Sequence, residues 1–268
     1  MLTNLVRHDR HIVLAALVIL TLAAWVYVLW LADQMDASAA SAIDMPMDMD
    51  MDMSGMMMPQ LASWNFTHAI FIFTMWAVMM VGMMTPSAAP MILLYAQIAR
   101  QAGTQGTVFA PAGYFASGYL LAWTAFAAVA TLAQYGLEQA ALLSPMMAAS
   151  SNHAGGAILI CAGLYQLSPL KNACLAQCRA PLTFVQRHGG FQAEAAGSLG
   201  LGALHGAYCI GCCWALMALL FVVGVMNVLW IAILAIVVLA EKIFPAGRHL
   251  AMGTGVALLG YGIWMLAF

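Results

Sequence analysis

Long apolar runs without charge constrain this chain more than any other feature. Residues 12–32 form one such run, and residues 198–240 form another that is long enough for two membrane crossings. About 20 apolar residues in a helix cross the roughly 30 Å of hydrocarbon in a bilayer, where only helices and closed barrels satisfy their backbone. Few stretches suit strands. We therefore expect an all-α integral membrane protein, a helical bundle of about seven transmembrane helices.

The composition excludes other classes of protein. With 65% hydrophobic and 7% charged residues, the chain cannot bury its apolar surface in a water-soluble core. A net charge of -2 with only eight Lys and Arg residues argues against nucleic-acid binding, which needs a concentrated basic surface. Membrane lipid is therefore an expected partner, and nucleic acid is not.

The distribution of charge predicts the topology. Arg7 and Arg10 precede the first apolar run, which places the N-terminus in the cytoplasm. With seven spans, all eight Lys and Arg residues face the cytoplasm, and the C-terminus lies outside. We expect residues 1–32 to be an uncleaved anchor, 33–65 an external loop and 66–268 a metal-binding bundle. A cleaved signal peptide is the alternative for the first segment and would leave six spans.

The external loop has an unusual composition in which Asp and Met alternate. Thioethers select Cu(I), and the carboxylates add a negative field that concentrates cations. A solvated acidic linker is the alternative, but ordinary linkers use Ser, Gly, Glu and Lys. We predict a metal-capture loop formed by the eight methionines Met45, Met47, Met49, Met51, Met53, Met56, Met57 and Met58.

The stretch from His205 to Met217 places one imidazole, three thiols and one thioether in an apolar segment. In a helix, His205, Cys209, Cys212 and Cys213 fall within an arc of roughly 100° and span about 12 Å of axis. Converging nitrogen and sulfur donors favour Cu(I) before Zn(II), although the same thiols suit disulfide chemistry. An ionisable residue within a span indicates a functional site by default. We predict that this face, with Met217, binds metal.

The second expected span, from Phe66 onward, carries a stripe of methionines. His68, Met75, Met79 and Met83 share an arc of about 80°, and Met80 and Met84 lie on the neighbouring row. Core packing is the usual role of such a stripe, and a ladder of metal ligands facing His205 is the hypothesis. The prolines within residues 85–90 predict an interruption of this helix.

A cytoplasmic loop is expected at residues 171–197, and it contains a second pair of thiols. Cys174 and Cys178 are four residues apart, so a helix would place both on one face. Such a pair can hold Cu(I) or cycle as a dithiol, and two unrelated cysteines are the alternative. Soft donors are thus expected in the external loop, within the membrane and on the cytoplasmic side, which suggests that a metal ion is relayed between them.

Three blocks of sequence, at 79–90, 165–179 and 205–217 with 241–242, resemble a known family. This is the family of bacterial predicted metal-binding integral membrane proteins of unknown function, often described as copper-chaperone-like. The resemblance implies a bacterial inner membrane protein, with the Met/Asp loop and the C-terminus in the periplasm. It also implies a copper role, which in that family is inferred from such residues.

Together these features predict a non-enzymatic protein that captures Cu(I) outside and transports or delivers it through the His/Cys/Met site. A periplasmic copper donor or a recipient cuproenzyme is the expected partner. A membrane thiol-disulfide oxidoreductase is one alternative, using Cys212 or Cys213 with the pair Cys174 and Cys178. A haem-binding electron-transfer protein is another, with a ligand among His68, His153 and His205.

Overall fold

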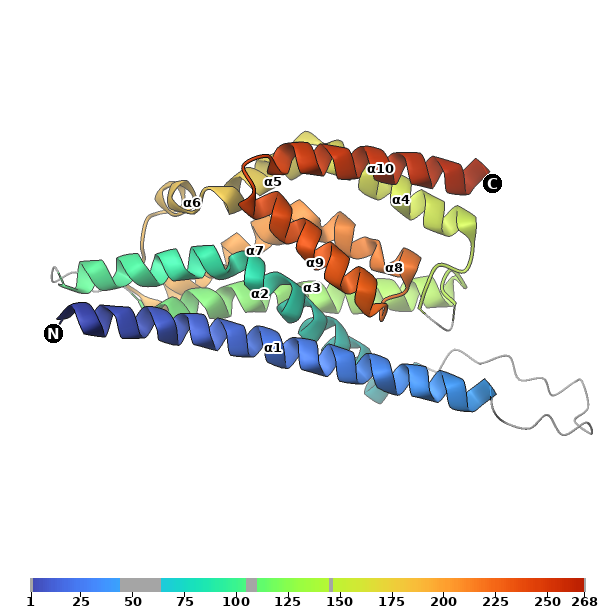
Figure 1. The fold of residues 1–268 in the computed structure, drawn as a ribbon, viewed down its shortest axis with the longest axis horizontal. Helices are drawn as coiled ribbons and strands as arrows, with labels where there is room; N and C mark the ends of the chain where they lie inside the picture. Colours follow the sequence, from blue (N-terminus) through green and yellow to red (C-terminus); the bar gives the residue numbers. More distant parts are fainter. Residues whose placement is uncertain (1, 44–63, 105–109, 145–146, 268) are drawn as a thin grey trace, which may run out of the picture.

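The computed structural model describes residues 2–43, 64–104, 110–144 and 147–267, and over these ranges it contains helices and no strand. The expected all-α fold is therefore confirmed. The long helices run roughly along the long axis, with α1 at one side and α4 and α10 at the other (Figure 1). The helices are α1 (Leu2–Ile43), α2 (Phe66–Thr104), α3 (Ala112–Gln139), α4 (Asn152–Leu167), α5 (Pro169–Arg179), α6 (Pro181–Arg187), α7 (Ala195–Ala218), α8 (Leu220–Val223), α9 (Val228–Ile243) and α10 (Gly247–Ala267).

Five helical segments are long and apolar enough to cross a membrane, which is compatible with the expected class of protein. They are His11–Met35, Phe66–Ala102, Ala112–Gln139, Ala195–Val223 and Gly247–Ala267. α4 and α5 pass the same test together, but they are bent by 62°. α9 has 16 residues and is only about 24 Å long. The expected count of about seven spans is thus not confirmed.

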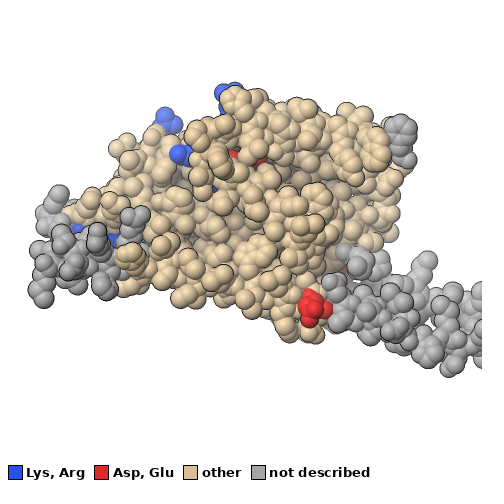
Figure 2. Space-filling view, viewed as in Figure 1, with Lys and Arg blue, Asp and Glu red and all other residues tan. Residues whose placement is uncertain are grey.

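The surface has the character expected of lipid contact. In Figure 2 basic side chains appear toward one end of the visible face and an acidic group toward the other, while the wide area between them is almost uncharged. Many large apolar side chains are exposed on the long helices, among them Ile19 of α1, Leu132 of α3 and Ile263 of α10. Extended exposed apolar surface of this kind marks contact with a membrane or a partner.

α3 and α7 approach each other closely because glycines line their contact. A Cβ atom added at Gly202 would lie 2.0 Å from the carbonyl oxygen of Phe115, and one added at Gly118 would lie 1.9 Å from that of Leu199. Small residues of this kind let membrane helices pack backbone against backbone. As a result, the polar face of α7 lies directly against α3, whereas α2 packs between α1 and α3.

The expected interruption of the second span at its prolines is wrong, because α2 continues through Pro86 and Pro90. Pro86 has no N–H to donate to the carbonyl of Gly82 one turn earlier. Trp25 of α1 replaces it, with its Nε1 donating to that carbonyl at 3.3 Å. The helix changes direction near its middle in Figure 1 instead of ending. A long-range donor thus satisfies the backbone group that the proline frees.

Substituting Trp25 should therefore destabilise the contact between α1 and α2. Trp25→Phe removes the Nε1 donor and leaves the Gly82 carbonyl in an apolar environment, which should cost about 1–3 kcal/mol of unfolding free energy. Unfolding in mixed detergent micelles measures the loss. Trp30→Phe, at an exposed position of the same helix, is the control. Equal stability of both variants would show that the bond is not needed.

Candidate metal site

α7 presents its predicted face to the interior of the bundle. His205, Cys209, Cys212, Cys213 and Met217 are all buried, each with at most 3% of its surface exposed. The helix spans Ala195–Ala218 without a break, so the predicted 3.6-residue spacing is confirmed. α3 and α5 cover this face. The apolar run of residues 198–240 is divided by a turn near Gly224, since α8 ends at Val223 and α9 begins at Val228.

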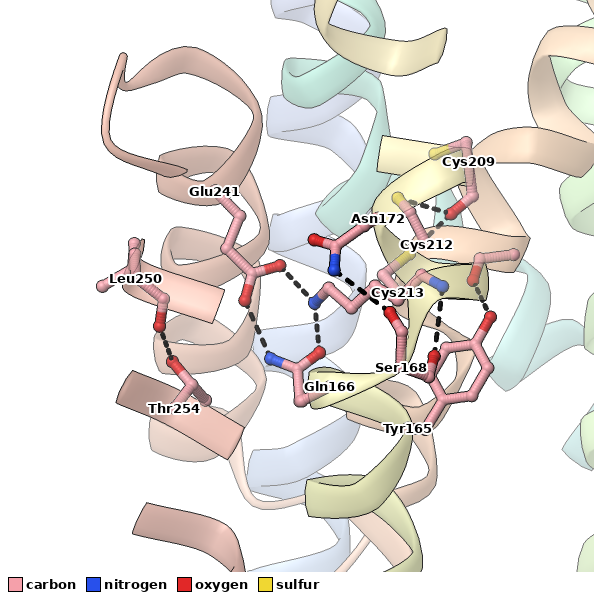
Figure 3. A network of polar contacts seen from close by, with 12 residues as sticks. Tyr165, Gln166, Ser168, Asn172, Cys209, Cys212, Cys213, Glu241, Leu250 and Thr254 are labelled. Carbon is pink, nitrogen blue, oxygen red and sulfur yellow. Dashed lines mark hydrogen bonds and ion pairs between the residues drawn. The ribbon is translucent and has the colours of Figure 1, made fainter. Parts of the chain in front are cut away.

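The thiols of α5 and α7 meet, and we call Cys178, Cys209, Cys212 and Cys213 the thiol cluster. Cys178 of α5 lies beside Cys209 and Cys212 of α7. The Sγ atoms of Cys212 and Cys213 each donate to the carbonyl oxygen of Cys209 at 3.0 Å (Figure 3). Cys174 lies at the edge, with its Sγ 2.8 Å from the position that a Cβ atom on Gly211 would occupy. All six cysteines of the chain are free thiols.

The bend between α4 and α5 brings the Cys174–Cys178 segment to this place. A proline disfavours helical backbone in the residue before it, so Ser168-Pro169 ends α4. The same pair then starts α5, with Pro169 in the first turn and Ser168 Oγ accepting from Lys171 N. Tyr165 also donates its hydroxyl to the carbonyl of Gly211 on α7. The segment expected to be part of a cytoplasmic loop thus packs against α7.

Two side chains that were not among the predicted ligands complete the surroundings of Cys209. Lys242 Nζ lies 2.8 Å from Cys209 Sγ and 2.9 Å from Ser87 Oγ of α2. The Tyr119 hydroxyl of α3 lies 3.1 Å from the same sulfur and donates to the Met84 carbonyl at 3.2 Å. Side chains from α3 and α9 therefore contact the Cys209 sulfur directly, and α2 is joined to it through them.

A buried ion-pair network lies beside the thiol cluster. The carboxylate of Glu241 accepts from Lys171 Nζ at 2.5 Å and from Gln166 Nε2 at 2.9 Å (Figure 3). Lys171 also donates to the side-chain oxygen of Gln166. Lys171 is completely buried and Lys242 nearly so. The interpretation of both lysines as loop charges is therefore wrong, because each side chain has partners inside the bundle.

His205 occupies an aromatic compartment one helical turn before Cys209. The rings of Phe184, Phe115 and Tyr119 surround it, with centroids 5.0, 5.9 and 5.9 Å from that of the imidazole. Its Nδ1 atom is buried and has no hydrogen-bond partner among the described residues. A buried imidazole nitrogen without a hydrogen-bond partner is chemically suited, when it carries no proton, to a soft or borderline metal ion.

The methionine stripe of α2 lies in the core. Met75, Met79, Met80, Met83 and Met84 are all nearly inaccessible to solvent. α2 reaches the thiol cluster through Ser87 and the Met84 carbonyl. The helix that lies along α7 is α3, so the methionines do not form its direct facing row.

His68 lies at the other end of α2, at a distance from the thiols. It packs edge-on against Trp64, whose Nε1 donates to the Glu138 carboxylate at 2.6 Å. His68 and Met84 are 16 residues apart, or about 24 Å along the helix, so they do not share one ion. The predicted capture-loop methionines, from Met45 to Met58, lie outside the described residues.

The side chains as placed do not form a finished coordination shell. Within the described ranges, no three His, Cys, Asp or Glu residues converge as metal ligands. Cys212 and Cys213 instead donate their thiol hydrogens to the Cys209 carbonyl group. Two-coordinate binding of Cu(I) needs only two of these sulfurs, whereas structural zinc is almost always four-coordinate. The donor chemistry therefore fits a soft monovalent ion after side-chain rotation.

Comparison with known proteins agrees with this chemistry. A family described as "PpoB2: Copper chaperone" matches residues 73–265, which include the thiol cluster, the ion-pair network and most of α2. The Met/Asp-rich loop and α1 lie outside the matched range. No curated protein and no solved structure matches the chain. The expected copper-chaperone resemblance is confirmed, and the chain belongs to the PpoB2 copper chaperone family.

Proposed function

We propose that the protein binds Cu(I) within the membrane at the thiol cluster and passes it on, without catalysing a reaction. The observation that carries this proposal is that thiols from two separate helices lie together. Cys212 and Cys213 of α7 donate to the Cys209 carbonyl, and Cys174 of α5 packs against Gly211 of α7. Membership of a copper chaperone family supports the copper role. Thiolate ligands in turn favour Cu(I), because soft donors select soft ions.

The neighbouring donors suggest how the ion reaches and leaves the thiol cluster. His205 lies one turn before Cys209, and Met217 lies one turn after Cys213. Cys174 lies at the edge of the thiol cluster, beside Gly211. The α2 methionines would be weak intermediate ligands on the way from the Met/Asp-rich loop. In this scheme the loop captures copper in the periplasm of a bacterium, from solution or from a donor protein, and a cuproenzyme receives it.

Cu(I) titration of the purified full-length protein tests the proposal. We expect about one Cu(I) ion per chain at the thiol cluster in competition with a chromogenic Cu(I) chelator. Cys209→Ser should weaken binding by more than about 100-fold, because even second-shell changes at metal sites cost 10- to 100-fold. Cys161→Ser is the matched control, since this thiol is exposed on α4 and should leave the affinity unchanged.

Two further measurements separate this function from redox chemistry. Free thiols are counted with and without reductant, and an unchanged count contradicts a thiol-disulfide cycle. Deleting residues 45–58 should slow copper loading without changing the affinity of the thiol cluster. Equal Cu(I) affinity of the native protein and the Cys209→Ser variant would refute the proposed site.

A further inference from the structure

A lysine side chain reaches into the thiol cluster, where a cation-binding protein would not be expected to place a basic group. Lys242 Nζ is 2.8 Å from Cys209 Sγ, and its other partner is the neutral hydroxyl of Ser87. The adjacent carboxylate, Glu241, is engaged by Lys171 and Gln166. Within the described part of the chain, no carboxylate forms an ion pair with Lys242. Its charge therefore has a thiol as its closest polar partner.

The ion-pair network explains why Lys242 points into the thiol cluster. Consecutive residues of a helix point about 100° apart, so two adjacent side chains of α9 can contact different neighbouring helices. Glu241 faces α4 and α5, where Lys171 and Gln166 hold it, and Lys242 faces α2 and α7. The network thus fixes the rotation of α9 that keeps the ammonium group beside Cys209.

We propose that Lys242 determines metal specificity, because its charge makes the complex of a monovalent ion with two thiolates electrically neutral. This inference rests on the proposed function. A metal-bound thiol has lost its proton to solvent. Two thiolates and Cu(I) therefore carry one negative charge, which the ammonium group cancels. Burying an uncompensated charge costs several kcal/mol per ion, so neutrality has a large effect on affinity.

A divalent ion is disfavoured by the same charge. Two thiolates neutralise Zn(II) by themselves, so the ammonium group would leave one positive charge in excess. Neutrality would then require a third thiolate, and zinc would also require a four-coordinate shell. The described side chains do not present three converged ligands of the His, Cys, Asp or Glu type. Lys242 therefore favours Cu(I), and by the same chemistry Ag(I), over Zn(II).

The test compares affinities for Cu(I), Ag(I) and Zn(II) in full-length protein purified in detergent. Lys242→Gln keeps hydrogen-bonding groups but removes the charge, and Lys242→Met removes both. Either variant should lower the ratio of Cu(I) to Zn(II) affinity by about 100-fold, and the ratio of Ag(I) to Zn(II) affinity equally. Lys242→Arg keeps the charge and should restore most of both ratios. Arg248→Gln removes a basic side chain at an exposed position outside the thiol cluster, so it should leave both ratios unchanged.

The outcomes distinguish failure of the inference from failure of the proposed function. Native protein that binds Cu(I) but shows the same ratios in the Gln or Met variant would overturn the charge role and leave the copper site intact. Native protein that binds Zn(II) as tightly as Ag(I) would overturn it as well, even if neither variant folds. Native protein that binds no Cu(I) would overturn the proposed function and the inference with it.

Discussion

Replacing Glu241 by alanine should lower the free energy of unfolding by about 3–5 kcal/mol, because the change leaves the Lys171 ammonium buried without its countercharge. Lys171 is completely buried, and its other partner is the neutral Gln166 side chain. Unfolding in mixed detergent micelles measures the loss.

Two controls separate the ion pair from other effects of the Glu241 substitution. Glu194→Ala removes a carboxylate at an exposed position and should change stability by less than about 0.5 kcal/mol. The double variant Lys171→Met/Glu241→Met replaces the whole pair by apolar groups and should recover most of the loss. A double variant as unstable as Glu241→Ala would contradict the explanation, since no unpaired charge remains in it.

Gly202→Ala should be the second strongly destabilising change, at about 3 kcal/mol. Its new Cβ atom would lie 2.0 Å from the carbonyl oxygen of Phe115, a backbone atom that cannot rotate away, so α3 and α7 must separate. Separation moves Tyr119 of α3 away from Cys209 of α7, so Cu(I) affinity should fall together with stability.

Gly200→Ala is the matched control for this change, because it makes the same substitution in the same helix. A Cβ atom at Gly200 meets nothing within 4 Å, so the variant should gain about 0.5–1 kcal/mol from the higher helix propensity of alanine. Thermal unfolding and Cu(I) titration of both variants measure the two effects. Similar melting temperatures for both would show that the close approach of α3 and α7 is not needed.

The sequence predicted the helical face of α7 because that face depends on local information. His205, Cys209 and Cys213 recur at the spacing of one turn, and a polar residue in an apolar helix has to be placed toward protein. The all-helical class followed in the same way from the length of the apolar runs. Neither conclusion required knowledge of a partner segment.

The convergence of α5 on α7 could not be predicted, because it depends on contacts between residues far apart in sequence. Lys171 was interpreted as a loop charge, since basic residues usually mark cytoplasmic loops. Its partner Glu241 lies 70 residues later, and no local pattern connects the two. Cys178 was therefore treated apart from the α7 thiols beside which it lies.

Lys242 was missed for the same reason, although a local signal was present. The sequence places Glu241 and Lys242 together directly after a long apolar run, where a charge-counting rule interprets them as the membrane boundary. Both are buried and point to different partners. The proline effect in α2 was also overestimated, because the compensating donor Trp25 comes from another helix.

The hydrogen bond from Trp25 to the Gly82 carbonyl shows that the part of the chain that packs together is longer than the part that matches the family. Similarity to the family begins at residue 73, after α1 has ended. Yet α1 supplies the Trp25 donor to the Gly82 carbonyl, which Pro86 leaves without its usual N–H partner. Gly82 also allows close packing of α1, because a Cβ atom at this position would crowd Ala24. A protein shortened to residues 73–265 would leave the Gly82 carbonyl group without its donor. The first helix, α1, is accordingly part of the packed bundle, and a protein expressed for structural work should retain it.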